Sequence, residues 1–115
     1  MALEEIKKIV EYRLPFQRLD QNSKSLHVLD CLLSNYELPQ TIEEIQSFTN
    51  LDGTNIREIL DVFIHENIVT LKNEDGEQVY LANFHSPKTT GLFQYYRAIL
   101  DENLSNLEYN KVDLK

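Results

Sequence analysis

The chain has 115 residues, the length of one ordinary domain, and its composition of 42% hydrophobic and 26% charged residues is typical of a globular protein. Its 19 acidic residues outnumber its 11 basic residues, so the formal net charge is -8. This balance repels polyanions at long range and is the reverse of what most nucleic-acid-binding proteins carry. The one cysteine, Cys31, excludes an internal disulfide, and its apolar neighbours predict a buried thiol.

The chain begins with acidic residues, whereas a secretory signal begins with basic residues followed by a long apolar run. No stretch is apolar over the length that is needed to span a bilayer. We therefore expect a cytoplasmic protein without membrane contact.

The first two predicted elements are helices. Residues 3–14 place apolar side chains at helical spacing, and Pro15 ends this element because a residue before proline avoids the helical conformation. Ser23 is a favourable N-cap for the second helix, which we expect to stop before Pro39.

The third predicted helix begins with a capping box. Thr41 and Glu44 have the required spacing, and Asn50 is suited to close the helix in a left-handed conformation. The residues that we expect on its buried side are Ile42, Ile45 and Phe48.

A fourth helix follows a predicted tight turn at Asp52-Gly53. We expect Thr54 to cap this helix and Asn67 to end it. Its apolar positions from Ile56 onward follow the spacing i, i+3, i+4, i+7 and i+8, which is typical of a helix with one buried face.

A hairpin and a last helix complete the chain. Branched residues over 68–72 predict a strand, Asp75-Gly76 is the turn signal, and residues 78–82 are predicted to form the returning strand. Residues 86–88 are predicted to form a loop, and a long helix is expected from about Thr90 to Glu108, with a frayed tail beyond it.

This order of elements resembles the winged-helix-turn-helix family. The matching segment, residues 41–83, reads TIEEIQSFTNLDGTNIREILDVFIHENIVTLKNEDGEQVYLAN. The resemblance implies a mainly α fold with a small β-hairpin, in which a winged-helix core over 23–84 is flanked by helices over 3–14 and 90–108 within a single domain, 1–115. The flanking helices resemble those of small prokaryotic regulators of the MarR and PadR type, which dimerise through their terminal helices.

The family resemblance implies a homodimeric transcriptional regulator that binds double-stranded DNA in a sequence-specific way. The helix over 54–66 would enter the major groove, where Arg57 would bind guanine and Asn55 would bind adenine. The predicted DNA-binding residues are Lys24, Thr54, Asn55, Arg57, His65, Lys72 and Lys88. The acidic side chains of Glu58 and Asp61 are expected on the same face, where they disfavour phosphate contacts.

The terminal helices carry more apolar surface than a small domain needs to complete its core. This favours a two-fold dimer formed by these helices over packing of both helices onto their own domain. The predicted interface residues are Leu3, Ile6, Val10, Phe93, Tyr96, Ile99, Leu100 and Leu104.

Two other functions fit the residues. An acidic protein-interaction module with a basic protein partner is the alternative to DNA binding. A ligand-responsive regulator is a variant of the first hypothesis, with a pocket lined by Tyr12, Tyr36, Tyr95 and Tyr96. The sequence has no recognised catalytic arrangement and no paired metal-ligand spacing, so we predict no enzyme activity, no metal site and no cofactor.

Overall fold

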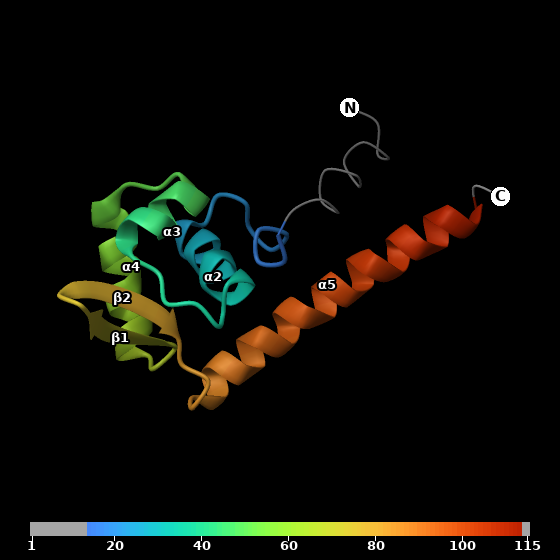
Figure 1. Cartoon of the computed structure of the whole chain (residues 1–115). Helices are drawn as coiled ribbons and strands as arrows, with labels where there is room; N and C mark the ends of the chain where they lie inside the picture. Colours follow the sequence, from blue (N-terminus) through green and yellow to red (C-terminus); the bar gives the residue numbers. More distant parts are fainter. Residues whose placement is uncertain (1–13, 114–115) are drawn as a thin grey trace.

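The computed structural model describes residues 14–113, which form helices and one β-hairpin in the arrangement shown in Figure 1. The elements are α2 (Lys24–Ser34), α3 (Ile42–Thr49), α4 (Gly53–His65), β1 (Val69–Glu74), β2 (Glu77–Ala82) and α5 (Pro87–Asp113). The chain is therefore mainly α with a small antiparallel hairpin, as the sequence predicts. The predicted helix over 3–14 lies outside the described residues, apart from Leu14, which is not helical.

The starts of α2 and α3 follow the predicted caps. The Ser23 hydroxyl accepts a hydrogen bond from the backbone N–H of Leu26, and Thr41 and Glu44 form the complete capping box. Asn50 closes α3 with a left-handed φ of 60°.

The expectation that Phe48 lies on the buried side of α3 is wrong, because its side chain is 42% exposed. In this eight-residue helix the buried positions are Ile45 and Thr49, whose hydroxyl donates to the carbonyl of Ile45. Position 48 lies about 100° around the helix from position 49, which places the ring at the edge of the contact with the core.

The cap of α4 differs from the prediction. Asp52 is the N-cap, Gly53 is the first helical residue, and Thr54 is inside the first turn. Asp52 is the N-cap in place of Thr54 because its carboxylate accepts two hydrogen bonds from Asn55. One comes from the backbone N–H at 2.9 Å and the other from the side-chain amide at 2.8 Å. The predicted Asp-Gly turn is therefore the cap and first turn of the helix.

The hairpin pairs β1 with β2 from Val69 opposite Ala82 to Glu74 opposite Glu77. Asp75 and Gly76 form its two-residue turn with positive φ values of 52° and 83°, as a type I′ turn requires. A turn this short lets β1 extend beyond its predicted end.

A buried polar cluster connects the other edge of β2 to α2. Gln40 and Tyr80 exchange two backbone hydrogen bonds, which adds a short third strand segment to the hairpin. The Gln40 side chain accepts from the Cys31 thiol and donates to the Cys31 carbonyl, so the cysteine is buried, as predicted. Burial raises the pKa of Cys31 to about 12, which makes the thiol unreactive.

The core consists of two neighbouring apolar clusters. The first joins α2, α3, α4 and the hairpin through Val28, Cys31, Leu32, Ile45, Ile56, Leu60, Val69 and Tyr80. The second joins α2, β2, α5 and the residues before α2 through Phe16, Leu29, Leu33, Ala82 and Tyr96. These contacts fix α4 on the body of the domain and leave its opposite face free.

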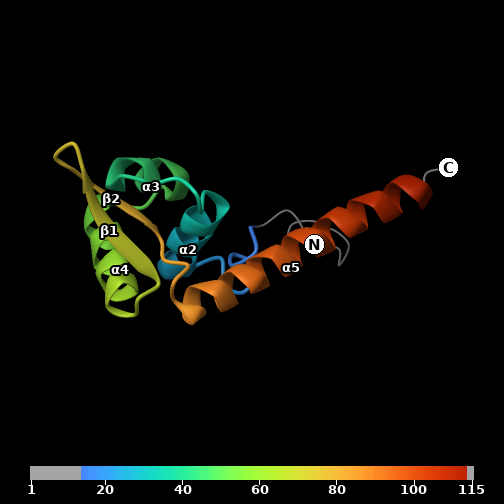
Figure 2. The ribbon, with the colours of Figure 1, turned by 60° about the horizontal axis from the view of Figure 1, so that its bottom comes forward.

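The last helix is longer than predicted at both ends. It begins at Pro87, because proline is favoured in the first helical turn, and it continues through residues 108–113, which contain no glycine or proline. Its first turn is anchored by Thr89, whose hydroxyl donates to the carbonyl of Ile68 at the junction of α4 and β1. The whole helix is about 40 Å long. Its early turns pack against the domain through Phe93 and Tyr96, and its later part projects away from the domain in Figures 1 and 2.

Candidate nucleic-acid interface

The outward face of α4 is an exposed polar surface on a helix whose inner face is held in the core. Ile56 and Leu60 are fully buried beneath it. The exposed side chains on the helix are Thr54, Arg57, Glu58, Asp61, Val62 and His65. Among the titratable groups of this face, one cation stands beside two carboxylates, so its electrostatic attraction for phosphate is weak.

The first turns of α4 bring three of the predicted DNA-binding residues together. Thr54 and Arg57 line an open hollow of about 350 Å³ with Ile42 and Gly53. Asn55 is close by in sequence but half-buried, and its amide donates to the Asp52 carboxylate. This end of α4 therefore presents a guanidinium and a hydroxyl to a ligand, whereas the Asn55 amide already has a partner.

The remaining predicted residues are spread over other parts of the domain. His65 is exposed in the last turn of α4, and Lys24 is exposed in the first turn of α2, which packs against α3 and α4. Lys88, in the first turn of α5, forms an exposed ion pair with Glu66 at 2.6 Å and lowers the pKa of that carboxyl. The structure thus gives Lys88 a partner within the protomer that DNA phosphate would have to replace.

The hairpin forms the wing, and its tip is acidic. Lys72 is exposed on β1, and the exposed carboxylates at the tip belong to Glu74, Asp75 and Glu77. Lys72 also lines a shallow hollow of about 480 Å³ between the hairpin, the residues after α2 and the residues before α5. A single cation on the wing limits its contribution to phosphate binding.

The predicted dimer residues on α5 are divided between the domain and solvent. Tyr96 is only 4% exposed and packs in the core of its own protomer, where burial raises the pKa of its phenol, and Phe93 is partly buried beside it. Ile99 is half-buried, whereas Leu100 and Leu104 are 38% and 59% exposed. The exposed leucines lie where α5 leaves the domain; the predicted residues Leu3, Ile6 and Val10 lie outside the described chain.

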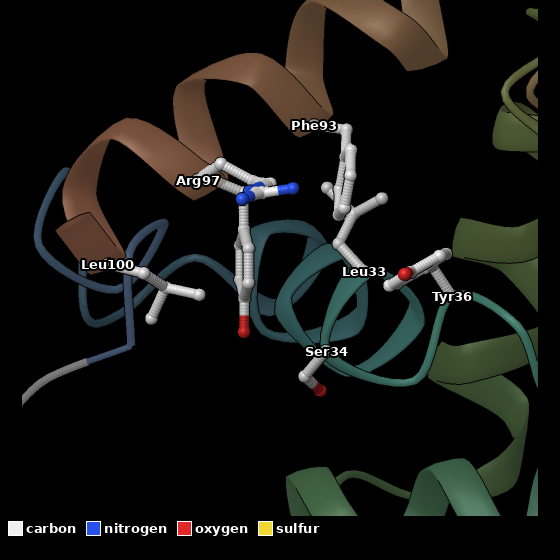
Figure 3. Close-up of a pocket in the computed structure, with 7 residues that line it drawn as sticks. Leu33, Ser34, Tyr36, Phe93, Arg97 and Leu100 are labelled. Carbon is white, nitrogen blue, oxygen red and sulfur yellow. The ribbon is translucent and has the colours of Figure 1, made fainter.

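A pocket lies between the end of α2 and the base of α5. It has a volume of about 260 Å³, and its lining residues are Leu33, Ser34, Tyr36, Phe93, Tyr96, Arg97 and Leu100 (Figure 3). Of the tyrosines that were predicted to line a ligand pocket, Tyr36 and Tyr96 line this one. Tyr95 is not part of the lining; its ring centroid lies 5.2 Å from that of Phe16. Tyr12 is outside the described residues.

Two features of the surface were not predicted from the sequence: an exposed apolar side chain on α4 and an aromatic cluster at the base of α5. Val62 is 59% exposed in the middle of the outer face of α4. Position 62 is not in the apolar series that starts at Ile56 and predicts the buried face. Its absence from that series is the signal that could have predicted an exposed valine. Tyr36, Phe84 and Phe93 form an aromatic cluster at the base of α5, with ring centroids 4.8 to 5.7 Å apart; no local sequence pattern joins them.

In residues 14–113 no three His, Cys, Asp or Glu side chains come together in a way that would hold a metal ion. Within the same part of the chain, no helix is both long and apolar enough to cross a membrane.

Several solved structures are similar to this chain. A mutant of MepR from S. aureus has a TM-score of 0.61 at 13% sequence identity, covering 96% of this chain and 85% of that chain. Another MepR mutant, bound to an oligodeoxyribonucleotide, has a TM-score of 0.60 at 15% identity, covering 96% and 86%. The homodimeric winged helix-turn-helix DNA-binding domain Mb0332 from Mycobacterium bovis, described as a possible ArsR-family transcriptional regulator, has a TM-score of 0.54 at 19% identity, covering 92% and 93%.

No protein-family model and no curated protein sequence matches the chain. At the sequence identities of the solved structures, the likeness is one of fold. The element order, the hairpin register and these neighbours together establish that the chain has the winged helix-turn-helix fold.

Proposed function

We propose that the protein is a sequence-specific double-stranded DNA-binding transcriptional regulator that acts as a homodimer. The observation that carries this proposal is the outer face of α4, the second helix of the helix-turn-helix. Its inner face is held by the fully buried Ile56 and Leu60, so its outer face is presented as a rigid surface of the size that a major groove accepts. The nucleic acid bound to one neighbour and the homodimeric DNA-binding domain of another support this assignment.

The N-terminal end of α4 supplies the base contacts in this proposal. Arg57 is exposed and suited to bind the O6 and N7 atoms of a guanine, and Thr54 beside it is suited to a phosphate or a base edge. Asn55 reads an adenine only if its amide leaves the Asp52 carboxylate, so we assign it a smaller part in affinity. Lys72 on the wing contacts phosphate, and Lys24, His65 and Lys88 lie at the margins of the contact.

The acidic residues determine how such a complex behaves in salt. Glu58 and Asp61 lie on the helix face beside Arg57, so close approach to the phosphates is opposed at both positions. A single protomer therefore makes few phosphate contacts and binds weakly. A dimer doubles the contacts, which is why homodimerisation belongs to the proposal.

The projecting part of α5 provides the dimer surface. Leu100 and Leu104 are exposed on a helix that extends about 40 Å from its anchor, and a second copy would cover them by packing its own α5 against this one. Two-fold symmetry would then present two α4 helices to half-sites about one DNA turn apart, on a pseudo-palindromic operator.

The experiment is fluorescence anisotropy of labelled duplexes, first from a random pool and then from the selected operator, titrated at low and at near-physiological salt. Arg57→Ala should weaken operator binding by about 1 to 3 kcal/mol for each half-site and relax specificity at one base pair of each half-site. Lys72→Ala should weaken binding to all duplexes alike and reduce the salt slope by about two, one for each protomer of the dimer.

Arg97→Ala is the matched control, because Arg97 is also exposed but lies on α5 beside the pocket at its base. It removes the same charge, so it should leave operator selectivity unchanged. Equal losses in the Arg57 and Arg97 variants would contradict the placement of α4 in the groove. No binding of any duplex at low salt would contradict the proposed function itself.

A second candidate is a protein-interaction module with a basic partner, and the wing favours it. At its tip the hairpin has three exposed carboxylates, those of Glu74, Asp75 and Glu77, and its one exposed cation is Lys72 on β1. In this case a lysine-rich peptide binds in a salt-sensitive way, and the double variant Glu74→Gln/Glu77→Gln weakens that binding. The same variant should strengthen duplex binding if the wing contacts phosphate, so one pair of substitutions separates the two candidates.

A further inference from the structure

The outer face of α4 carries one apolar side chain that the fold leaves in solvent. Val62 is 59% exposed, and among the 13 residues of α4, all of which the structure describes, it is the only exposed apolar residue. The other apolar side chains of this helix are buried or pack against the core. Packing within the domain therefore does not account for Val62.

The helix geometry directs Val62 away from the core. It follows the fully buried Leu60 by two residues, so the two side chains are about 160° apart around the helix. Glu58 lies one turn before Val62 and His65 one turn after it, and both are exposed. Val62 is thus part of the surface that the proposed function places in the major groove.

Helix propensity does not account for Val62 either. A branched side chain is restricted in χ1 within a helix, so valine is a poorer helix former than alanine or leucine. Its exposed methyl groups also remain in contact with water in the free protein. A contact with a ligand is the interaction that would use them.

The chemistry of the major groove offers one apolar partner. Thymine presents a 5-methyl group there, whereas the other groups at the base edges are hydrogen-bond donors or acceptors. The exposed neighbours Glu58, Asp61 and His65 are polar, so Val62 is the side chain of this part of α4 that suits a methyl group. An apolar contact needs no phosphate, so the nearby carboxylates do not oppose it directly.

The proposed dimer surface leaves this contact open. In Figures 1 and 2, α4 lies on the far side of the domain from the projecting part of α5. A second copy that covers Leu100 and Leu104 would therefore leave Val62 uncovered. The exposed valine remains available to DNA in the proposed dimer.

We propose that Val62 is a specificity-determining residue whose methyl groups contact the 5-methyl group of a thymine in each operator half-site. This inference rests on the proposed function, because it requires α4 in the major groove. Val62 follows Arg57 by five residues, which is about 7.5 Å along the helix, and stacked base pairs are about 3.4 Å apart. The thymine therefore lies about two base pairs from the guanine that Arg57 binds.

The experiment is fluorescence anisotropy of the full chain with the selected operator, in which each thymine is replaced in turn by deoxyuridine in both half-sites. This replacement removes one methyl group and leaves the hydrogen-bonding groups of the base pair unchanged. One thymine near the guanine should lose about fourfold in affinity for each half-site, and the other positions should change little. Val62→Ala should abolish the difference between thymine and deoxyuridine at that position, which a double-mutant cycle measures.

Leu19→Ala is the matched control, because Leu19 is 61% exposed in a turn before α2 and its truncation removes apolar surface outside α4. It should leave the thymine preference unchanged. Position 62 is exposed, so Val62→Ala should fold normally.

The outcomes separate the inference from the proposed function. A chain that binds no duplex refutes both. An operator that is bound equally well with deoxyuridine at every position, or a thymine preference that Val62→Ala retains, refutes the role of Val62 and leaves DNA binding standing.

Discussion

The orientation of α4 about its own axis decides which side chains can meet a ligand, and two truncations on opposite faces test it. Ile56 is fully buried in the core that joins α2, α3, α4 and the hairpin. Val62, six residues later, is 59% exposed. The paired perturbation is Ile56→Ala and Val62→Ala.

The expected free energies follow from what each truncation removes. Ile56→Ala deletes three buried carbons, worth about 0.8 kcal/mol each in transfer free energy, and leaves a cavity that adds to the loss. We expect the free energy of unfolding to fall by about 3 to 4 kcal/mol. Val62→Ala removes two mostly hydrated methyl groups and replaces a branched residue by the best helix former, so we expect a change of less than about 0.5 kcal/mol.

Urea denaturation followed by far-ultraviolet circular dichroism measures both changes on the same scale. Similar m-values in the two variants would show that the unfolding reaction itself is unchanged. A loss of less than about 1 kcal/mol for Ile56→Ala, or a loss of similar size for Val62→Ala, would refute the orientation and with it the assignment of Arg57 to the outer face.

Three further predictions use other parts of the chain. Asp52→Ala should lower the free energy of unfolding by about 1 kcal/mol, because it removes the cap that accepts from the Asn55 N–H, whereas Thr54→Ala should leave it nearly unchanged. Thermal unfolding of both variants measures the difference, and equal effects would contradict the assignment of Asp52 as the cap. The free energy of unfolding contributed by Asp30 should decrease, by at most about 3 kcal/mol, as the pH rises from about 4 to 6, because burial in α2 raises the pKa of the folded carboxyl from 3.8 to about 6. Urea titrations at several pH values should show this decrease in the wild type relative to Asp30→Asn, and parallel curves would refute it. Leu104→Asp places a charge on an exposed apolar position of α5, so sedimentation should show a shift from dimer to monomer. Circular dichroism should show unchanged helix content. A wild-type chain that is already monomeric would contradict the proposed interface.

The sequence predicts most of the fold because its local signals agree with one another. The capping box at Thr41, the left-handed Asn50 and the Asp75-Gly76 turn each satisfy a backbone requirement within a few residues, and the structure confirms all of them. The apolar spacing of α4 correctly separates Ile56 and Leu60 from the exposed Arg57.

The errors arise where two local choices are similar in energy or where distant residues decide. Asp52 and Thr54 are both good caps, and the choice depends on the two bonds that the carboxylate makes to Asn55. Phe48 has the spacing of a core residue, but the small Thr49 takes the buried position in α3. Tertiary packing settles both cases, and a local pattern does not contain it.

The candidate site is predicted less completely than the fold. Exposure of Arg57, His65 and Lys72 follows from helix and strand periodicity, and the structure bears it out. The partner of Lys88, by contrast, is Glu66, 22 residues earlier in the chain. The burial of Tyr96 also depends on Phe16, which is 80 residues earlier in the chain and packs against its ring. Such pairings arise from the way that the elements pack together.

The anchoring of α5 has a mechanical consequence. Its first turn is bonded through Thr89 to the carbonyl of Ile68, at the junction where α4 gives way to the hairpin, and the helix then continues to Asp113. The part of α5 beyond Tyr96, its last residue in the buried core, is about 25 Å long, so a tilt of about 5° moves its far end by roughly 2 Å. A partner that holds the far end of α5 therefore acts first on the packing of Tyr96 and, through the Thr89 bond, on the junction that orients the outer face of α4.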